Sequence, residues 1–200
     1  MPSGECPRPI LSHYAAHVNA DEVLAIYRDL DAEGVPVWID GGWCVDALLG
    51  RQTREHSDLD LAVAREHARR LRELFGRWGY APIPRQDTTD WSYVVAKGSS
   101  SVDVHVFEYD DQGRNTYGIE YPHGSLTGTG VIAGQEVRCV GAEWMFRFKT
   151  AYPPQDKDLE DVRALGEAYG FEIPATHRGR SAGHASPARG KARTVKGDSA

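Results

Sequence analysis

The segment VPVWIDGGWCVDALLGRQTREHSDLDLAV, residues 35–63, decides the fold of this chain. Its first part, Val35–Ile39, predicts a buried strand. The pair Gly41-Gly42 follows, and it allows the backbone to turn sharply and approach a ligand because no Cβ stands in the way. Residues 43–49 then predict a short helix. A strand, two glycines and a helix N-terminus form a natural anion site, since free N–H groups and the helix dipole point to one place.

Two acids follow on a second predicted strand, residues 57–63. Asp58 and Asp60 lie two positions apart, so they share one face of this strand. Their Cα atoms are then roughly 6–7 Å apart, which lets both carboxylates converge on magnesium or a pair of hard cations. Without a cation the two charges would repel each other. The alternative is an exposed strand edge that carries two acids, and the Gly-Gly turn before the strand weakens it.

Capping and periodicity predict the remaining elements. Asn19 and Glu22 form the pattern of a capping box, at the start of a helix that runs to Glu33. We expect helices over 64–78, 142–150 and 156–169, strands over 91–97, 101–108, 131–132 and 136–140, and an irregular loop over 117–130. Asp103 and His105 share one face of the strand 101–108. They add a third acid and an imidazole to the candidate site residues.

Composition sets limits on the function. The chain has 200 residues, 40% of them hydrophobic, which fits one domain without an apolar run long enough to span a membrane. A formal net charge of −6 argues against a nucleic-acid partner and suits a cationic small molecule better. Cys6, Cys44 and Cys139 are widely spaced and form neither a disulfide framework nor a zinc pattern. Together with an N-terminus that lacks a signal-peptide core, they indicate a cytoplasmic location.

The string from Trp38 to Asp60 resembles the small antibiotic nucleotidyltransferases, which comprise the lincosamide nucleotidyltransferases and the aminoglycoside 2''-adenylyltransferase-like group. The resemblance extends over roughly residues 20–168. It implies an α+β fold of the nucleotidyltransferase (polymerase-beta-like) type, with a mixed sheet flanked by helices and a short C-terminal helical segment. One departure is Cys44, at a position where such enzymes are expected to have a third glycine.

The resemblance and the composition together divide the chain into four expected segments. These are a flexible N-terminal arm (1–18), a nucleotidyltransferase domain (19–140), a C-terminal helical segment (141–172) and a disordered basic tail (173–200).

The resemblance also implies a reaction, the magnesium-dependent transfer of AMP from ATP to a hydroxyl of a small antibiotic, either a lincosamide or an aminoglycoside. Asp58, Asp60 and Asp103 match the metal-binding and catalytic acids of the superfamily. Asp103 could complete the metal site or act as general base on the hydroxyl, and the sequence does not separate these roles. An edge-strand acid bonded to a turn is the structural alternative.

Five further positions are expected to bind the nucleotide. Gly41, Gly42 and the backbone at Trp43 would hold the β- and γ-phosphates, while the Trp43 side chain fits the core better. Arg54 is expected to contact a phosphate or to form a structural salt bridge. Lys149 could reach the triphosphate or remain a surface lysine.

Two other functions stay open. One is transfer of AMP to protein or RNA, as in toxin–antitoxin nucleotidyltransferases. The other is a non-catalytic, antitoxin-like binding module, although the three acids and both glycines count against an inactive site. The expected partners of the favoured enzyme are a nucleoside triphosphate and a small hydroxyl acceptor, without a membrane or nucleic acid, and a homodimer stays open.

Overall fold

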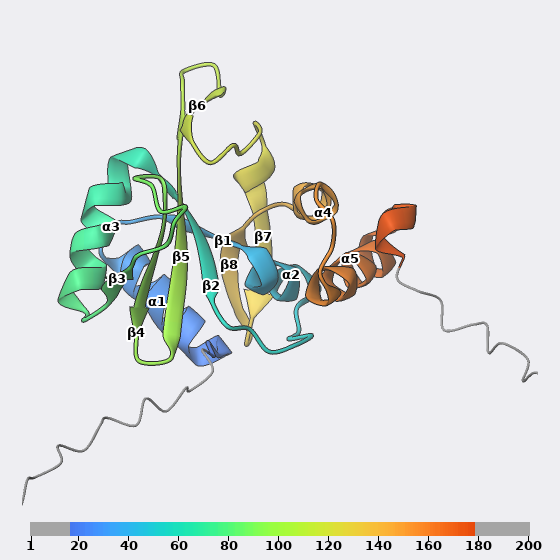
Figure 1. Cartoon of the computed structure of the whole chain (residues 1–200), viewed down its shortest axis with the longest axis horizontal. Coiled ribbons are helices and arrows are strands. Elements are labelled where there is room, and N and C mark those ends of the chain that lie inside the picture. Colours follow the sequence, from blue (N-terminus) through green and yellow to red (C-terminus); the bar gives the residue numbers. More distant parts are fainter. Residues whose placement is uncertain (1–16, 179–200) are drawn as a thin grey trace, which may run out of the picture.

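The computed structural model of the chain describes residues 17–178, which form a mixed sheet flanked by helices (Figure 1). The helices are α1 (Ala20–Ala32), α2 (Gly41–Leu49), α3 (Arg65–Arg77), α4 (Ala142–Thr150) and α5 (Asp156–Tyr169), with short 3-10 helices η1 (Ser125–Thr127) and η2 (Ala175–His177). The strands are β1 (Val37–Asp40), β2 (Leu59–Ala64), β3 (Ala81–Ile83), β4 (Ser92–Lys97), β5 (Ser100–Tyr109), β6 (Asn115–Gly118), β7 (Gly128–Ile132) and β8 (Gln135–Cys139). This arrangement confirms the predicted α+β class.

The strand order explains how distant acids meet. The sheet runs β3-β4-β5-β2-β1-β8-β7, and β6 pairs with β5 outside this path. β2 is antiparallel to β1 and parallel to β5. β8 is parallel to β1, with Cys139 opposite Ile39. The Gly-Gly segment therefore follows a central strand, and its neighbour β2 carries Asp60 beside β5.

The predicted elements are found with small shifts at their ends. Asn19 and Glu22 form the predicted capping box at α1. α2 begins at Gly41, two residues earlier than expected, because Asp40 is extended and its Oδ1 accepts a hydrogen bond of 2.7 Å from the Gly41 N–H. Gly50 ends α2 in the left-handed region, with φ 65°. The two glycines are thus the first turn of the helix itself.

The stretch 117–130 is more regular than the sequence predicts. It contains the end of β6, η1 and the start of β7. Gly118, with φ 81°, packs so closely on β5 that a Cβ would lie 1.9 Å from the Val106 carbonyl oxygen. The glycine that breaks the sequence periodicity therefore permits close strand pairing. The short strand β3 also escaped prediction, because all three of its residues are exposed and show no burial pattern.

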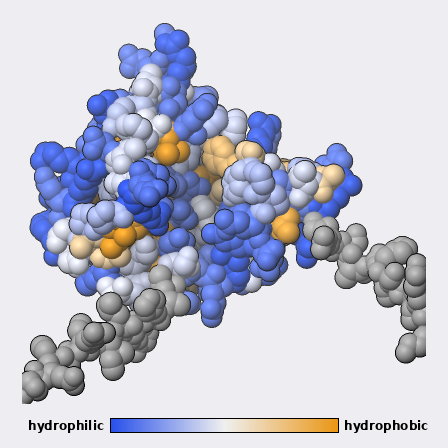
Figure 2. Space-filling view, in the orientation of Figure 1, coloured by the Kyte–Doolittle hydropathy of each residue, from blue (hydrophilic) through white to orange (hydrophobic). Residues whose placement is uncertain are grey.

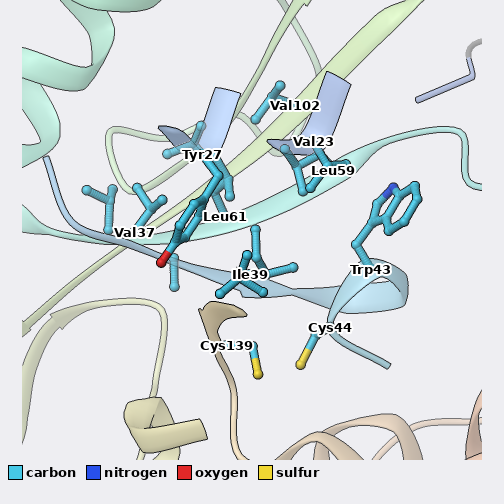
Figure 3. Packing of buried hydrophobic residues seen from close by; sticks show 14 of the residues in the cluster. Val23, Tyr27, Val37, Ile39, Trp43, Cys44, Leu59, Leu61, Val102 and Cys139 are labelled. Carbon is cyan, nitrogen blue, oxygen red and sulfur yellow. The ribbon is translucent and has the colours of Figure 1, made fainter. Parts of the chain in front are cut away.

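Buried side chains from both faces of the sheet form a continuous core (Figure 3). Val23 and Tyr27 of α1 cover β1 and β2, where Ile39 and Leu61 are completely buried. Trp43 of α2 is also buried, as the core alternative predicted. Polar residues dominate the face of the molecule seen in Figure 2. Within residues 17–178 there is no helix with the length and apolar character of a membrane span.

The C-terminal helices pack against the domain that precedes them. α4 and α5 contact each other and both contact α2, and Tyr169 donates a hydrogen bond of 2.8 Å to the Leu48 carbonyl. Ile173 packs against Gly166, and the 3-10 helix η2 follows it. The first residues of the expected disordered tail, 173–178, are therefore folded against α5. Residues 1–16 of the expected arm and 179–200 of the expected tail lie outside the described residues.

Candidate active site

Two acids from adjacent strands meet at the centre of the site. Asp60 of β2 stands opposite Asp103 of β5 in their parallel ladder, so both side chains leave the same face of the sheet. One ligand atom from each of Asp60, Asp103 and His105 lies within 4.8 Å of the others. Arg85 also donates a hydrogen bond of 3.1 Å to Asp103 Oδ2 from the loop between β3 and β4. The structure thus brings together two of the three predicted acids.

Asp58 lies at the edge of this cluster. It precedes β2 by one residue and lines the same cavity as Asp60. It is not one of the three residues whose ligand atoms converge within 4.8 Å. Its negative charge nevertheless raises the pKa of Asp60.

Asp60 is a destabilised carboxylate. Burial is the largest cause that raises its pKa to about 7, and repulsion from Asp58, Asp40 and Asp103 adds to it. His105 opposes the rise. No hydrogen bond to the Asp60 carboxylate forms among residues 17–178. A group of this kind gains free energy from a cation placed beside it.

His105 lies between the acid pair and Asp40. Its Nε2 is 3.6 Å from Asp103 Oδ1, and its Nδ1 is 3.5 Å from Asp40 Oδ2. Burial would lower the pKa of His105, but Asp40, Asp60 and Asp103 outweigh it and raise the pKa to about 9. Burial would likewise raise the pKa of Asp40, but bonds from His105, Tyr121 and the Gly41 N–H lower it.

The two glycines place the start of α2 against these acids. Gly41 has φ 59°, and a Cβ there would lie 1.9 Å from Asp60 Oδ2. A Cβ on Gly42 would lie 2.5 Å from both Arg54 Nη2 and His56 Nδ1. The Trp43 side chain turns into the core and stacks on His56, with ring centroids 4.6 Å apart. The backbone of Trp43 lies in the first turn of α2, and it is the backbone that the sequence predicts to bind phosphate.

Arg54 and Lys149 form a buried charge network with α5. Arg54 Nε and Nη2 each donate a hydrogen bond of 2.9 Å to Asp161. Lys149 Nζ lies 2.9 Å from Asp161 and 3.2 Å from Asp158. Burial would lower the pKa of Lys149, but these two acids raise it overall. Both cations also line the cavity, so they face it while they are held by α5.

A cavity of about 680 Å³ is lined by Asp40, Asp58, Asp60 and His105 together with Arg54 and Lys149, whereas Asp103 and Asp161 lie outside its lining. Its acids lie mainly toward the sheet and α2, and Ile119, Met145 and Phe148 form an apolar wall. The acids that line it are Asp40, Glu55, Asp58, Asp60, Glu120 and Asp158. The basic residues that line it are Arg54, Lys149 and Lys157. A volume of this size accommodates a small-molecule ligand.

A divalent cation fits the acid pair. Three ligand atoms converge within 4.8 Å, and the repulsion that raises the pKa of Asp60 to about 7 would be relieved by a positive charge. Because Gly41 has no side chain, Asp60 Oδ2 can occupy the position beside it without a steric clash. Asp60 and Asp103 are therefore the acids that would hold the ion.

Several residues of the site escaped the sequence analysis. Asp40 directly follows the predicted strand 35–39 and carries no sequence signal of its own, and Tyr121 lies in a stretch without periodicity. Asp158 and Asp161 carried a usable signal, because they occupy the same buried face of α5 as Val162 and Leu165. Acids are rarely fully buried unless they are paired, so two acids on an apolar face indicate partners elsewhere in the fold.

The parallel β2–β5 pair with its acids, next to a glycine-led helix, defines a nucleotidyltransferase. The chain belongs to the aminoglycoside-2''-adenylyltransferase family, whose model matches residues 22–165. This membership confirms the resemblance seen in the sequence and makes the protein an enzyme of the nucleotidyltransferase type.

Individual relatives support this assignment. A 2''-aminoglycoside nucleotidyltransferase from Escherichia coli is 33% identical over 167 residues, which cover 78% of this chain and 92% of the relative. A lincosamide resistance protein from Staphylococcus haemolyticus is 41% identical over 157 residues, which cover 74% of this chain and 95% of the relative. The two relatives represent the aminoglycoside and the lincosamide group, between which the sequence did not decide.

Solved structures show the same fold. ANT(2'')-Ia in complex with adenylyl-2''-tobramycin matches with a TM-score of 0.62 and 29% identity, over 74% of this chain and 88% of that one. The lincomycin-bound lincosamide antibiotic adenylyltransferase LnuA matches with a TM-score of 0.64 and 22% identity, over 74% of this chain and 97% of that one. The second likeness concerns the fold alone.

Proposed function

We propose that this chain transfers AMP from ATP, with the help of magnesium, to a hydroxyl group of an aminoglycoside. The observation that carries the proposal is the placement of Asp60 opposite Asp103 at the N-terminus of α2. Acids in this position suit a divalent ion, and the helix N-terminus suits phosphate. The family and the relatives support the kind of reaction. The presence of ATP in the cytoplasm fits the expected location.

In this reaction the acceptor oxygen forms a bond to the α-phosphorus, the bond from the α-phosphorus to the bridging oxygen breaks, and pyrophosphate leaves. The hydroxyl proton must pass to a base. Asp103 is the carboxylate that we assign to this step, because burial raises its pKa even though His105 and Arg85 oppose the rise. A bound magnesium ion would neutralise charge on the phosphates.

Other residues position the triphosphate. The N–H groups of Gly42 and Trp43, in the first turn of α2, would bind phosphate oxygens, while the Gly41 N–H already donates to Asp40 Oδ1. Lys149 directs its ammonium group at Asp158 and Asp161, and an ammonium has three N–H donors. One donor of Lys149 therefore remains for a phosphate. Arg54 donates two hydrogen bonds to Asp161, so its main role is to hold the loop 51–58 in place.

The charge of the cavity favours an aminoglycoside as acceptor. Acids outnumber bases among the residues that line it, and Glu120 and Asp58 have no cationic partner within residues 17–178. Protonated amino groups would complement these carboxylates. A lincosamide is the second candidate, because of the 41% identical relative and the apolar wall of Ile119, Met145 and Phe148.

Mass spectrometry tests both candidates. The protein is incubated with ATP and Mg²⁺ and with either tobramycin or lincomycin, and an added AMP is sought on each compound. We expect AMP on tobramycin. AMP on lincomycin but not on tobramycin would show that the acceptor is a lincosamide. AMP on protein or RNA would favour the toxin–antitoxin alternative. Asp103→Asn provides the inactive control, since it keeps the size of the side chain and removes its charge.

A further inference from the structure

His105 carries a feature that the acid pair does not require. It follows Asp103 by two residues on β5, so both side chains leave the same face of the strand. The ring lies between Asp103 and Asp40. Nε2 faces Asp103 Oδ1 at 3.6 Å, and Nδ1 faces Asp40 Oδ2 at 3.5 Å. Each ring nitrogen therefore has a different environment.

Tyr121 decides which ring nitrogen carries the proton in a neutral imidazole. Its hydroxyl donates its single proton to Asp40 Oδ2 over 2.5 Å. The Tyr121 oxygen also lies 3.3 Å from His105 Nδ1, and with its proton committed to Asp40 it can only accept there. When an ion displaces one proton from the ring, the proton that stays is thus on Nδ1, and the lone pair of Nε2 faces Asp103 of β5.

This arrangement is the one that metal-binding histidines use. Such a histidine binds the ion through one nitrogen and donates its other N–H to a carboxylate or another oxygen, which fixes the ring. Here Asp40 and Tyr121 supply those oxygens. One nitrogen of His105 converges with Asp60 and Asp103 within 4.8 Å, and Nε2 is the nitrogen that faces Asp103, at 3.6 Å.

We propose that His105 is a direct nitrogen ligand of the divalent ion, with Asp40 and Tyr121 as the residues that position its ring. The inference rests on the proposed function only for the binding of an ion between Asp60 and Asp103. Magnesium is held through oxygen ligands, whereas first-row transition metals also bind imidazole, and Mn²⁺ is the one among them that shares the preference of Mg²⁺ for carboxylates. The site should therefore bind Mn²⁺ more tightly than Mg²⁺, by a factor that depends on His105.

Pulsed EPR of bound Mn²⁺ tests the proposal directly. The full-length protein is loaded with Mn²⁺, alone and with a non-hydrolysable ATP analogue, and the spectrum is searched for a nitrogen hyperfine coupling. Labelling the protein with ¹⁵N-histidine assigns the coupling, because the nucleotide keeps ¹⁴N. We expect a histidine nitrogen coupled to Mn²⁺ in the wild type and its loss in His105→Gln. A second measurement is the Mn²⁺ affinity, which should fall by about 10- to 100-fold in His105→Gln and in Tyr121→Phe.

Three comparisons complete the design. His67→Gln, on α3 beside Glu66, is the matched control and should change neither the coupling nor the affinity. The Mg²⁺ affinity should change less than the Mn²⁺ affinity in His105→Gln. Circular dichroism verifies that each variant is folded. If His105→Gln does not fold, Tyr121→Phe still tests the proposal, because it keeps His105 and removes only the hydroxyl that positions its ring.

The proposal is overturned if wild-type protein binds Mn²⁺ without a histidine coupling, if it binds no Mn²⁺ under either condition, or if His105→Gln retains the coupling. Its failure is distinct from that of the proposed function. AMP transfer without a histidine coupling removes only the role of His105. A histidine coupling without AMP transfer to any antibiotic removes only the proposed acceptor reaction.

Discussion

Arg54 and Asp161 are joined by two parallel hydrogen bonds of 2.9 Å, which tie the loop after α2 to the helix α5. Asp161 is 1% exposed and also holds Lys149. The sequence allowed Arg54 either a phosphate contact or a salt bridge, and the structure provides the salt bridge. Because the two cations depend on one buried carboxylate, α5 fixes the cavity wall that faces α2.

Asp161→Asn should therefore destabilise the protein strongly. The substitution leaves two buried cations with reduced compensation, and breaking a buried ion pair typically costs about 3–5 kcal/mol. Urea denaturation would measure the loss. Arg69→Ala is the matched control, since Arg69 forms an ion pair with Glu73 on the exposed face of α3, and such pairs are worth about 0–1 kcal/mol. Equal losses in the two variants would contradict the structural role of Asp161.

Gly41→Ala and Gly50→Ala should separate activity from stability. Both glycines have positive φ, 59° and 65°, so alanine costs each about 1–2 kcal/mol of backbone strain. At Gly50 the new Cβ meets nothing within 4 Å, whereas at Gly41 it would displace the Asp60 carboxylate. We expect similar thermal shifts but a loss of AMP transfer of about 100-fold in Gly41→Ala alone. Full activity in Gly41→Ala would remove Asp60 from the catalytic geometry.

Asp60→Asn should stabilise the metal-free protein at alkaline pH. The pKa of Asp60 rises from 3.8 to about 7 in the folded state, so the wild type loses stability as pH increases from about 4 to 7. Asparagine removes this loss. One pKa unit corresponds to about 1.4 kcal/mol, and partial exposure reduces the total, so we expect a gain of ~2 kcal/mol at pH 8 and little at pH 4.5.

Urea denaturation in EDTA at both pH values measures this gain, and AMP transfer should be lost in the same variant. Asp110→Asn is the control of opposite sign. The Arg114 backbone N–H, the Arg114 side chain and the Gln112 N–H lower the pKa of Asp110, so its stabilising effect is present above pH 3.8 and is lost as pH falls. A stability gain in Asp110→Asn at pH 8, or none in Asp60→Asn, would contradict the assignment.

The two buried thiols should be unreactive in the folded protein. Cys44 and Cys139 are completely buried (Figure 3), the Cys44 thiol donates to the Val140 carbonyl at 3.3 Å, and burial together with Cys139 raises the pKa of Cys44. In a Cys6→Ser variant, a thiol reagent such as DTNB should react only at the rate of unfolding. Rapid reaction in native buffer would show that the contact between α2 and β8 opens.

The position of Cys44 also answers the departure seen in the sequence. A third glycine is expected there, and a side chain larger than glycine would hinder phosphate if it pointed into the cavity. The thiol points into the core toward β8 and is not among the residues that line the cavity. The first turn of α2 therefore keeps its free N–H groups on the cavity side, and the larger side chain has no contact with the phosphate site.

The sequence predicted those parts of the fold that depend on local patterns. The capping box at Asn19, the glycine-led helix and the alternation around Asp60 and Asp103 are all readable within a few residues. Tyr121 could not be predicted, because it lies among residues without periodicity and acts through Asp40, 81 positions away. The pairing of Arg54 with Asp161 spans 107 positions, and only the folded chain reveals such a partner.

The insertion of β8 beside β1 has a consequence for synthesis on the ribosome. Ile39 pairs with Cys139, so a nascent chain exposes one edge of β1 until the last strand has emerged. An open edge beside apolar side chains is a template for pairing with other chains. Production of this protein should therefore benefit from slow translation or from chaperones that bind extended segments.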